Sequence, residues 1–281
     1  MRIIVAGAGE VGSYLVKMLS SEEHEIVIID NDEERLKNLA ATCDLMTMCG
    51  SVTSREFLIE TGVSETDLFI AVTSFDDTNI VSAIMAKKLG AKLTVVRIGK
   101  SEMLNRETRD IFTVLGIDSI VYPEKIAAHK VADTLRKSEQ KNENIVRVMI
   151  IGGSHIGRMI AKELGKDYSI KIFEADSEKA YYLSDNLNNV LVIHGDGTKS
   201  DFLLEEGLQT TDVFIAVTGN SETNILTCLL AKNEGVKHAV ADIENIDYIN
   251  IAERLGIDTI LNKKLIVADF IHRFTIGKMD I

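Results

Sequence analysis

The sequence predicts an α/β protein made of two tandem Rossmann-like units, each a doubly wound parallel sheet. First, the chain of 281 residues repeats itself: Asp67–Ile80 and Asp212–Ile225 are identical at nine of fourteen positions, at an offset of 145 residues. Second, apolar, strand-like runs alternate with segments of helical periodicity in each copy. This alternation favours parallel strands that are covered by helices on both faces.

The duplication covers a whole domain-sized unit. The same offset superposes four glycines of each copy: Gly7, Gly12, Gly50 and Gly62 on Gly152, Gly157, Gly195 and Gly207. Near the end of each copy, Leu115–Asp118 matches Leu255–Asp258 at an offset of 140. A repeat of about 140 residues is a typical domain length. We therefore expect domains at 1–136 and 145–281, joined by the polar, aperiodic segment 137–144.

Each element of the first copy follows from its local pattern. Residues 2–6 are an apolar, partly β-branched run, which predicts a strand, and residues 10–20 carry an apolar stripe at helical spacing. By the same criteria we expect strands at 26–29, 45–49, 68–72, 93–98 and 118–121, and helices at 32–41, 54–61, 77–89, 102–115 and 124–136. The last helix of each copy, 124–136 and 264–274, either packs on its own unit or crosses to a neighbouring one.

Composition narrows the class of protein. The net charge of −12 argues against binding to nucleic acid or anionic lipid. No apolar run approaches the roughly 18–20 residues that span a bilayer, and the first apolar run continues into Gly-Ala-Gly-Glu rather than a cleavage site. The three cysteines lack metal-ligand spacing, and we expect them to be reduced. The chain is therefore predicted to be cytoplasmic.

A glycine-rich turn follows the first strand. It reads Gly7-Ala8-Gly9-Glu10-Val11-Gly12 and opens the first helix, the context that a dinucleotide-binding motif requires. The first glycine permits the tight turn, the second lets the backbone approach a pyrophosphate, and the third allows close helix–strand packing. The helix N-terminus then offers N–H groups to the phosphates. The alternative is an ordinary turn without a ligand.

Asp30 closes the second strand, 23 residues after Gly7. A carboxylate at this place accepts hydrogen bonds from both ribose hydroxyls and repels a 2′-phosphate. The first copy therefore favours NAD(H), or another adenosine nucleotide, over NADP(H).

The second copy departs from this pattern. Its turn reads Gly152-Gly153-Ser154-His155-Ile156-Gly157, so a serine replaces the middle glycine. Its hydroxyl could donate to the phosphate that the extra Cβ would otherwise crowd. Glu174 takes the role of Asp30 and offers the same acceptors. The alternative is a second copy that no longer binds a ligand and has only a structural role.

Further candidates stand where the carboxyl ends of parallel strands should meet. Gly50 with Ser51, and Gly195 with Asp196, either flank an adenine or form simple turns. The next strands end at Thr73 with Ser74 and at Thr218 with Gly219, and we expect these residues close to the pyrophosphate. Asn79 and Asn224 follow one helical turn later, where they would tie down a loop.

The fifth strands end differently in the two copies. Arg97 offers a cation to phosphate, whereas its counterpart Asp242 has the opposite charge. We therefore expect the two crevices to differ in ligand affinity or identity.

Residues for catalysis and for metal binding are not apparent. The repeats occupy nearly the whole chain, which leaves no substrate domain. His155 and His194 fall near the second crevice, but Glu10 and Cys49 stand at those positions in the first copy. This favours a nucleotide sensor over an enzyme. The alternative is an NAD-dependent oxidoreductase whose pocket forms between subunits.

Several segments resemble one known family, namely Met1–Gly12, Ile28–Asp30, Ala71–Asn79, Arg97–Ile98 and Pro123–Glu124. The chain is similar over both copies to the TrkA family, cytoplasmic regulatory subunits of Trk-type potassium uptake systems, and each unit resembles an RCK (or KTN) domain of the N-terminal type. The resemblance implies a peripheral protein at the inner face of the cell membrane that binds NAD(H) or ATP/ADP. It also implies a homo-oligomer, a dimer or a tetrameric ring, beneath a membrane potassium-translocating subunit whose ion flux the nucleotide alters.

The resemblance also implies which residues bind the nucleotide. In the first copy these are the glycine turn, Asp30, Thr73 with Ser74, and Arg97; in the second they are Gly152–Ile156, Glu174 and Asp242. Family members usually carry a small C-terminal regulatory lobe after each unit. Because 137–144 is too short for such a lobe and seven residues follow Phe274, we expect both lobes to be absent.

Overall fold

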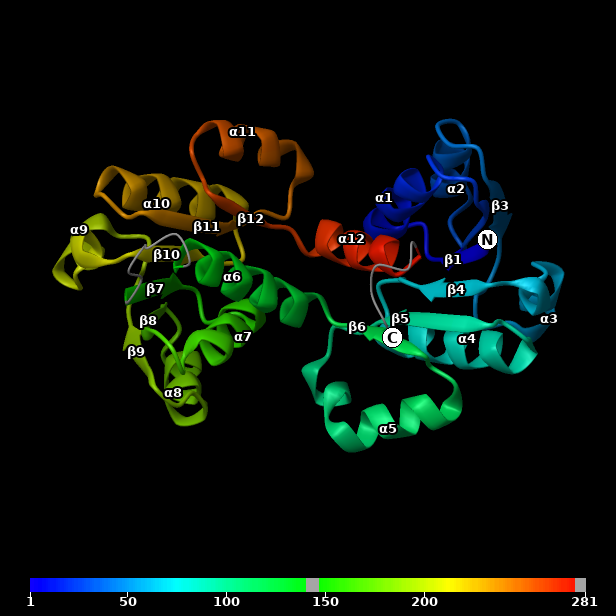
Figure 1. Ribbon diagram of the computed structural model, residues 1–281, viewed down its shortest axis with the longest axis horizontal. Coiled ribbons are helices and arrows are strands. Elements are labelled where there is room, and N and C mark those ends of the chain that lie inside the picture. The colour runs from blue at the N-terminus through cyan, green and yellow to red at the C-terminus, as the bar shows by residue number, and fades with distance from the viewer. Residues whose placement is uncertain (140–146, 276–281) are drawn as a thin grey trace. The chain divides into compact units, whose positions relative to one another are not determined.

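The computed structural model describes residues 1–139 and 147–275, which divide into two compact units (Figure 1). The first unit comprises Met1–Pro123 together with the last helix from Lys264 on, and the second comprises Glu124–Lys263. Each is an α/β unit with one six-stranded sheet.

The sheet of the first unit has the strand order β3-β2-β1-β4-β5-β6, with parallel pairing throughout. Its strands are β1 (Arg2–Ala6), β2 (Glu25–Asp30), β3 (Met46–Cys49), β4 (Leu68–Ala71), β5 (Leu93–Arg97) and β6 (Ser119–Val121). Its helices from this part of the chain are α1 (Glu10–Leu19), α2 (Glu33–Ala40), α3 (Arg55–Glu60), η1 (Val63–Glu65), α4 (Asp76–Leu89), η2 (Ser101–Leu104) and α5 (Arg106–Leu115).

The second unit repeats this order as β9-β8-β7-β10-β11-β12. Its strands are β7 (Arg147–Ile151), β8 (Ser169–Glu174), β9 (Val190–His194), β10 (Val213–Ala216), β11 (His238–Asp242) and β12 (Thr259–Leu261). Its helices are α6 (Pro123–Glu139), α7 (His155–Leu164), α8 (Ser177–Asn186), α9 (Ser200–Glu205), η3 (Leu208–Thr210), α10 (Ser221–Asn233), η4 (Ile246–Tyr248) and α11 (Ile249–Arg254). The order is that of doubly wound nucleotide-binding sheets, which confirms the predicted fold class.

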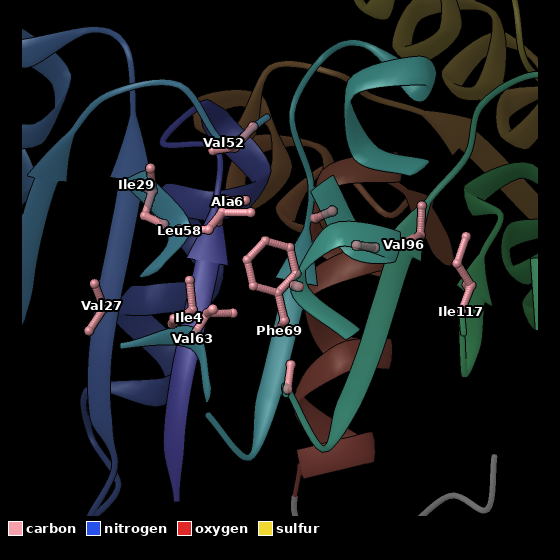
Figure 2. Close-up of a cluster of buried hydrophobic side chains, with 14 of the residues drawn as sticks. Ile4, Ala6, Val27, Ile29, Val52, Leu58, Val63, Phe69, Val96 and Ile117 are labelled. Carbon is pink, nitrogen blue, oxygen red and sulfur yellow. The ribbon is translucent and has the colours of Figure 1, made fainter. Parts of the chain in front are cut away.

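Alternating residues of the central strands build two apolar layers in each unit. In the first, Ile4 and Val27 lie on the face that Phe69 occupies, together with Val96 (Figure 2). Leu58 of α3 and other side chains from α4 and α5 close over this face. The intervening residues of β1 point to the opposite face, since successive strand side chains alternate, and they are buried too. Such burial on both faces explains the continuous apolar runs in the sequence.

The last helix of each repeat belongs to the other repeat's compact unit. The helix α12 (Lys263–Thr275) joins the first unit from Lys264 on, and α6 joins the second unit from Glu124 on. The compact units therefore differ from the chain boundaries expected at residues 136 and 145. Residues 137–139 of the expected linker continue α6, and the rest of that segment, 140–144, lies outside the described residues.

One predicted helix is divided. The segment 102–115 was expected to be continuous, but η2 ends at Leu104 and α5 begins at Arg106. Asn105 is extended, and its side-chain oxygen accepts the Thr108 amide at 2.8 Å, so it caps a new helix. The apolar periodicity of the segment did not reveal this cap.

The strand order creates a crevice in each sheet. In the first unit the chain leaves β1 toward β2 on one side, and β4 pairs with the other side of β1. The loops that follow β1 and β4 therefore diverge at their carboxyl ends, which is where such folds bind ligands. In the second unit the corresponding strands are β7 and β10.

Candidate functional site

The first glycine turn is shaped by close backbone contacts. Gly7 has a φ of +112°, and a Cβ on it would lie 2.9 Å from the Thr73 amide nitrogen. A Cβ on Gly12 would overlap the Gly7 carbonyl oxygen. By contrast, a Cβ on Gly9 would meet nothing within 4 Å. The fold therefore requires glycine at positions 7 and 12, whereas a side chain at position 9 would project into open space beside the crevice.

The first turn of α1 has no side-chain cap. Its N-cap residue is Gly9, which has no side chain that could accept a hydrogen bond from the first amides of the helix. The N-terminal amides of a helix need partners, and an anion can supply them. The residues present thus fit a bound pyrophosphate.

Asp30 links the end of β2 to the glycine turn. Its Oδ2 accepts the Ala8 amide at 2.6 Å and its Oδ1 accepts the Asp32 amide at 2.9 Å. The side chain is buried but borders the crevice. Each carboxylate oxygen retains a further lone pair, so the group can still accept a ribose hydroxyl.

The first crevice has a volume of about 320 Å³. Its lining includes seven of the predicted residues: Gly7, Gly9, Asp30, Gly50, Ser51, Thr73 and Ser74. Of the other predicted residues, Ala8 and Gly12 are buried in the turn, Val11 lies in α1 outside the lining, and the Glu10 carboxylate pairs with Lys264 of α12.

Asn79 fixes the loop that follows β4. Its Oδ1 accepts the Thr73 amide at 2.8 Å and the Thr73 hydroxyl at 2.6 Å. Its Nδ2 donates to the carbonyls of Thr73 and Arg97, at 3.1 and 3.0 Å. The side chain is fully buried. Asn79 therefore ties the ends of β4 and β5 together, as expected, and sets where the Thr73 loop meets the crevice.

The second unit repeats this clamp. Asn224 accepts the Thr218 amide and hydroxyl at 3.0 and 2.6 Å, and donates to the carbonyls of Thr218 and Asp242 at 3.2 and 2.7 Å. The two copies therefore share the same buried amide geometry.

Ser154 changes the second glycine turn. Gly152 keeps the positive φ, at +100°. The Ser154 hydroxyl donates to the Val217 carbonyl at 2.8 Å, and the same oxygen accepts the Gly157 amide at 3.4 Å. It therefore caps α7 and ties the turn to β10. The hydroxyl proton that was expected to serve a phosphate is thus engaged within the protein.

Glu174 matches Asp30 in its contacts. Its Oε2 accepts the Gly153 amide and its Oε1 the Asp176 amide, both at 2.9 Å. The second crevice has a volume of about 480 Å³. Its lining includes nine of the predicted residues: Gly152, Gly153, Ser154, His155, Glu174, Gly195, Asp196, Thr218 and Gly219. Ile156 and Gly157 are buried behind it.

Arg97 and Asp242 lie outside the crevice linings. Arg97 Nη1 donates to the Thr73 carbonyl at 3.3 Å. Asp242 is 5% exposed, and its Oδ1 makes no hydrogen bond within the part of the chain that the structure describes. Burial raises the pKa of the Asp242 carboxyl to about 6. The opposite charges of Arg97 and Asp242 therefore lie at the ends of β5 and β11 and not on the walls of the crevices.

Several residues that line the crevices were not predicted from the sequence. In the first crevice these include Asn31, Arg35, Thr53, Phe75 and Thr78, and in the second Arg158, Lys179, Tyr182 and Thr198. Arg35 and Lys179 share a signal, because each stands five residues after the acidic residue that ends the second strand of its copy. That spacing places them in the first turn of the next helix, facing the same crevice.

The TrkA-N domain family matches residues 3–123 and 148–263, which is most of both repeats. The chain belongs to this family. The "Trk system potassium uptake protein TrkA homolog" of Archaeoglobus fulgidus is 28% identical over 345 aligned positions, which cover 94% of this chain and 78% of the relative. The "Trk system potassium uptake protein TrkA" of Haemophilus influenzae is 28% identical over 346 positions, covering 92% and 75%. The predicted family resemblance is confirmed.

Solved structures of RCK proteins share the fold of this TrkA-N chain. GsuK bound to ADP superposes with a TM-score of 0.74 at 18% identity, covering 99% of this chain and 70% of that one. The GsuK channel bound to NAD gives 0.75 at 15% identity, covering 99% and 64%. Within residues 1–139 and 147–275, this chain has no helix of the length and hydropathy that crossing a membrane requires.

Proposed function

We propose that this chain is a cytoplasmic, nucleotide-binding regulatory subunit of a Trk-type potassium uptake system. The observation that carries the proposal is the pair of crevices, each with a glycine turn and a carboxylate, in a chain related along most of its length to proteins named for potassium uptake. These relatives bear the names of transport proteins and not of enzymes.

The ligand of the crevices is an adenine nucleotide, NAD(H) or ATP/ADP. The glycine turn and the uncapped N-terminus of α1 receive its phosphates, and Asp30 and Glu174 accept its ribose hydroxyls. The structural relative GsuK, which was solved with ADP and with NAD, supports this choice.

Regulation requires that the nucleotide bind two conformations differently. The exchanged helices offer a route, because α12 contacts α1 through Lys264 and Glu10, at the start of the helix that receives the phosphates. A nucleotide that shifts the start of α1 shifts a helix supplied by the other repeat. The working form is a homo-oligomer, a dimer or a tetrameric ring, at the inner face of the membrane below a potassium-translocating subunit.

The test combines binding with transport. NADH, ATP and ADP are titrated into the purified chain, and potassium uptake is measured in cells that carry a Trk-type translocating subunit with wild-type, Asp30→Ala or Glu174→Ala protein. The proposal expects saturable binding without NADH turnover, and altered uptake in the variants. Sustained oxidation of NADH with a carbonyl substrate would instead favour an oxidoreductase, and unchanged uptake in both variants would refute regulation through these crevices.

A further inference from the structure

The second crevice carries two cations beside its ribose-binding carboxylate. Arg158, in the first turn of α7, and Lys179, in the first turn of α8, both line the crevice with Glu174. The residue that corresponds to Arg158 in the first repeat is Ser13, at the offset of 145. Asp196 also lines the second crevice, so its two cations face two carboxylates, whereas Arg35 faces Asp30 in the first crevice. The crevices therefore differ in the number of cations that they offer to a ligand, not in formal net charge.

Arg158 is held in place by an aromatic ring. Its guanidinium carbon lies 5.5 Å from the centroid of the Tyr182 ring, which also lines the crevice. A guanidinium that stacks on a ring keeps its N–H groups at the edge free to bind an anion. Among residues 1–139 and 147–275, no carboxylate lies within ion-pair distance of Arg158. Its charge is available to a ligand.

Lys179 is also available. The N-cap Asp176 uses its Oδ1 to accept the Lys179 backbone amide at 3.0 Å. The Lys179 ammonium group lies beyond ion-pair distance of every carboxylate in the described part of the chain. Its charge still helps to lower the pKa of Asp176, after the hydrogen bond from the Lys179 amide, but at longer range than a direct ion pair. A lysine ammonium that lines a crevice without a direct ion pair is a point charge that can bind a phosphate.

The first crevice offers a weaker arrangement. Arg35 occupies the place of Lys179, counted from the acidic residue. Its Nε lies 3.1 Å from Oδ2 of Asp32, which also caps α2 through the Glu34 and Arg35 amides. Arg35 is therefore neutralised by a carboxylate of its own helix end, and Ser13 brings no second cation.

A carboxylate at the ribose discriminates against a 2′-phosphate, and a nearby cation offsets that repulsion. Two such cations flank Glu174. We propose that the second crevice accepts an adenine dinucleotide with a 2′-phosphate on the ribose, as in NADP(H), in addition to NAD(H), whereas the first crevice accepts only the form with a free 2′-hydroxyl. This inference rests on the proposed nucleotide-binding function and assigns a ligand class to each crevice.

The test is calorimetric titration of the full chain with NADH, NADPH, 2′,5′-ADP and ADP. We expect two sites for NADH and one for NADPH and for 2′,5′-ADP. Arg158→Ser, which introduces the residue of the first repeat, and Lys179→Ser should each weaken NADPH binding by about tenfold or more, because each removes a charged hydrogen bond. NADH affinity should change by less than about threefold. Lys166→Ser, an exposed position after the end of α7, is the matched control.

The outcomes separate this inference from the function on which it rests. If NADH does not bind, the proposed function fails. If NADH binds while NADPH binds at neither site, or equally at both, the ligand assignment fails. Loss of ADP binding with NADPH unaffected would show that the cations serve terminal phosphates, and it would overturn the inference. Lys179 is exposed, so its variant carries the test even if Arg158→Ser fails to fold.

Discussion

His272 and Glu22 lie 250 residues apart in the sequence, yet His272 Nε2 is 2.7 Å from Glu22 Oε1. The other carboxylate oxygen lies 2.9 Å from His24 Nε2. One glutamate therefore sits between two imidazoles and fastens α12, which the second repeat supplies, to the loop after α1 in the first unit. The hydrogen bond with His272, followed by the one with His24, lowers the pKa of Glu22 below its ordinary value of 4.5.

Glu22→Gln should weaken the attachment of α12. A carboxyl with a lowered pKa in the folded state contributes stability above its ordinary pKa, and that contribution is lost as the pH falls through the folded value. We expect the variant to lose about 0.5–1 kcal/mol of unfolding free energy at pH 6, and to match the wild type near pH 3. Urea denaturation gives the free energy, and hydrogen exchange locates the change in α12. The exposed neighbour Glu23→Gln is the control; equal losses in both variants would contradict a specific role for Glu22.

Asp242→Asn should stabilise the protein at neutral pH. Burial raises the pKa of this carboxyl from 3.8 to about 6, so the wild type gains stability from the protonated form below pH 3.8 and loses it as the pH rises through about 6. The amide carries no charge to desolvate. The expected gain at pH 7.5 is on the order of 1–3 kcal/mol and shrinks toward pH 4. Denaturation curves at both pH values measure it, with the exposed Asp247→Asn as control. A gain independent of pH would show that another cause is at work.

The glycines of the first turn should separate folding from ligand binding. Gly12→Ala places a Cβ on the Gly7 carbonyl, and overpacking of this kind costs about 1–3 kcal/mol or more. Gly9→Ala meets no atom within 4 Å, so its unfolding free energy should stay within about 0.5 kcal/mol of the wild type. Its Cβ nevertheless enters the space for the phosphates, and NADH affinity at the first crevice should fall. Unchanged affinity in Gly9→Ala would contradict that position for the phosphates.

Asn79→Ala should be among the most damaging polar substitutions. Asn79 is fully buried and makes four hydrogen bonds across the ends of β4 and β5. Its removal leaves buried backbone groups without partners, at about 1–3 kcal/mol each for those that water cannot reach. We expect a total loss of about 2–4 kcal/mol, measured by denaturant unfolding. Asn38→Ala, at an exposed position in α2, should cost less than about 1 kcal/mol. Similar losses at both sites would refute the clamp.

Much of the fold and of the crevices follows from local sequence. Continuous apolar strands between amphipathic helices require a covered parallel sheet, and the duplication requires two of them. Gly12 is dictated by its contact with the Gly7 carbonyl in the same turn, and Gly7 by its positive φ. Asp30 and Glu174 are dictated by their place at a strand end. These features depend on neighbours close in sequence or in the same supersecondary unit, so their pattern is visible in the chain.

The tertiary structure alone decided the rest. An apolar helix face shows that a helix is buried, but not against which unit, and so the sequence left open where α6 and α12 pack. The approach of Arg158 to Tyr182 depends on how α7 and α8 lie side by side over one sheet. Asp242 is buried, and Arg97 donates to the Thr73 carbonyl instead of lining the crevice. Both arrangements depend on the loops that follow neighbouring strands. Contacts between elements are set by packing, and no periodicity in the sequence records them.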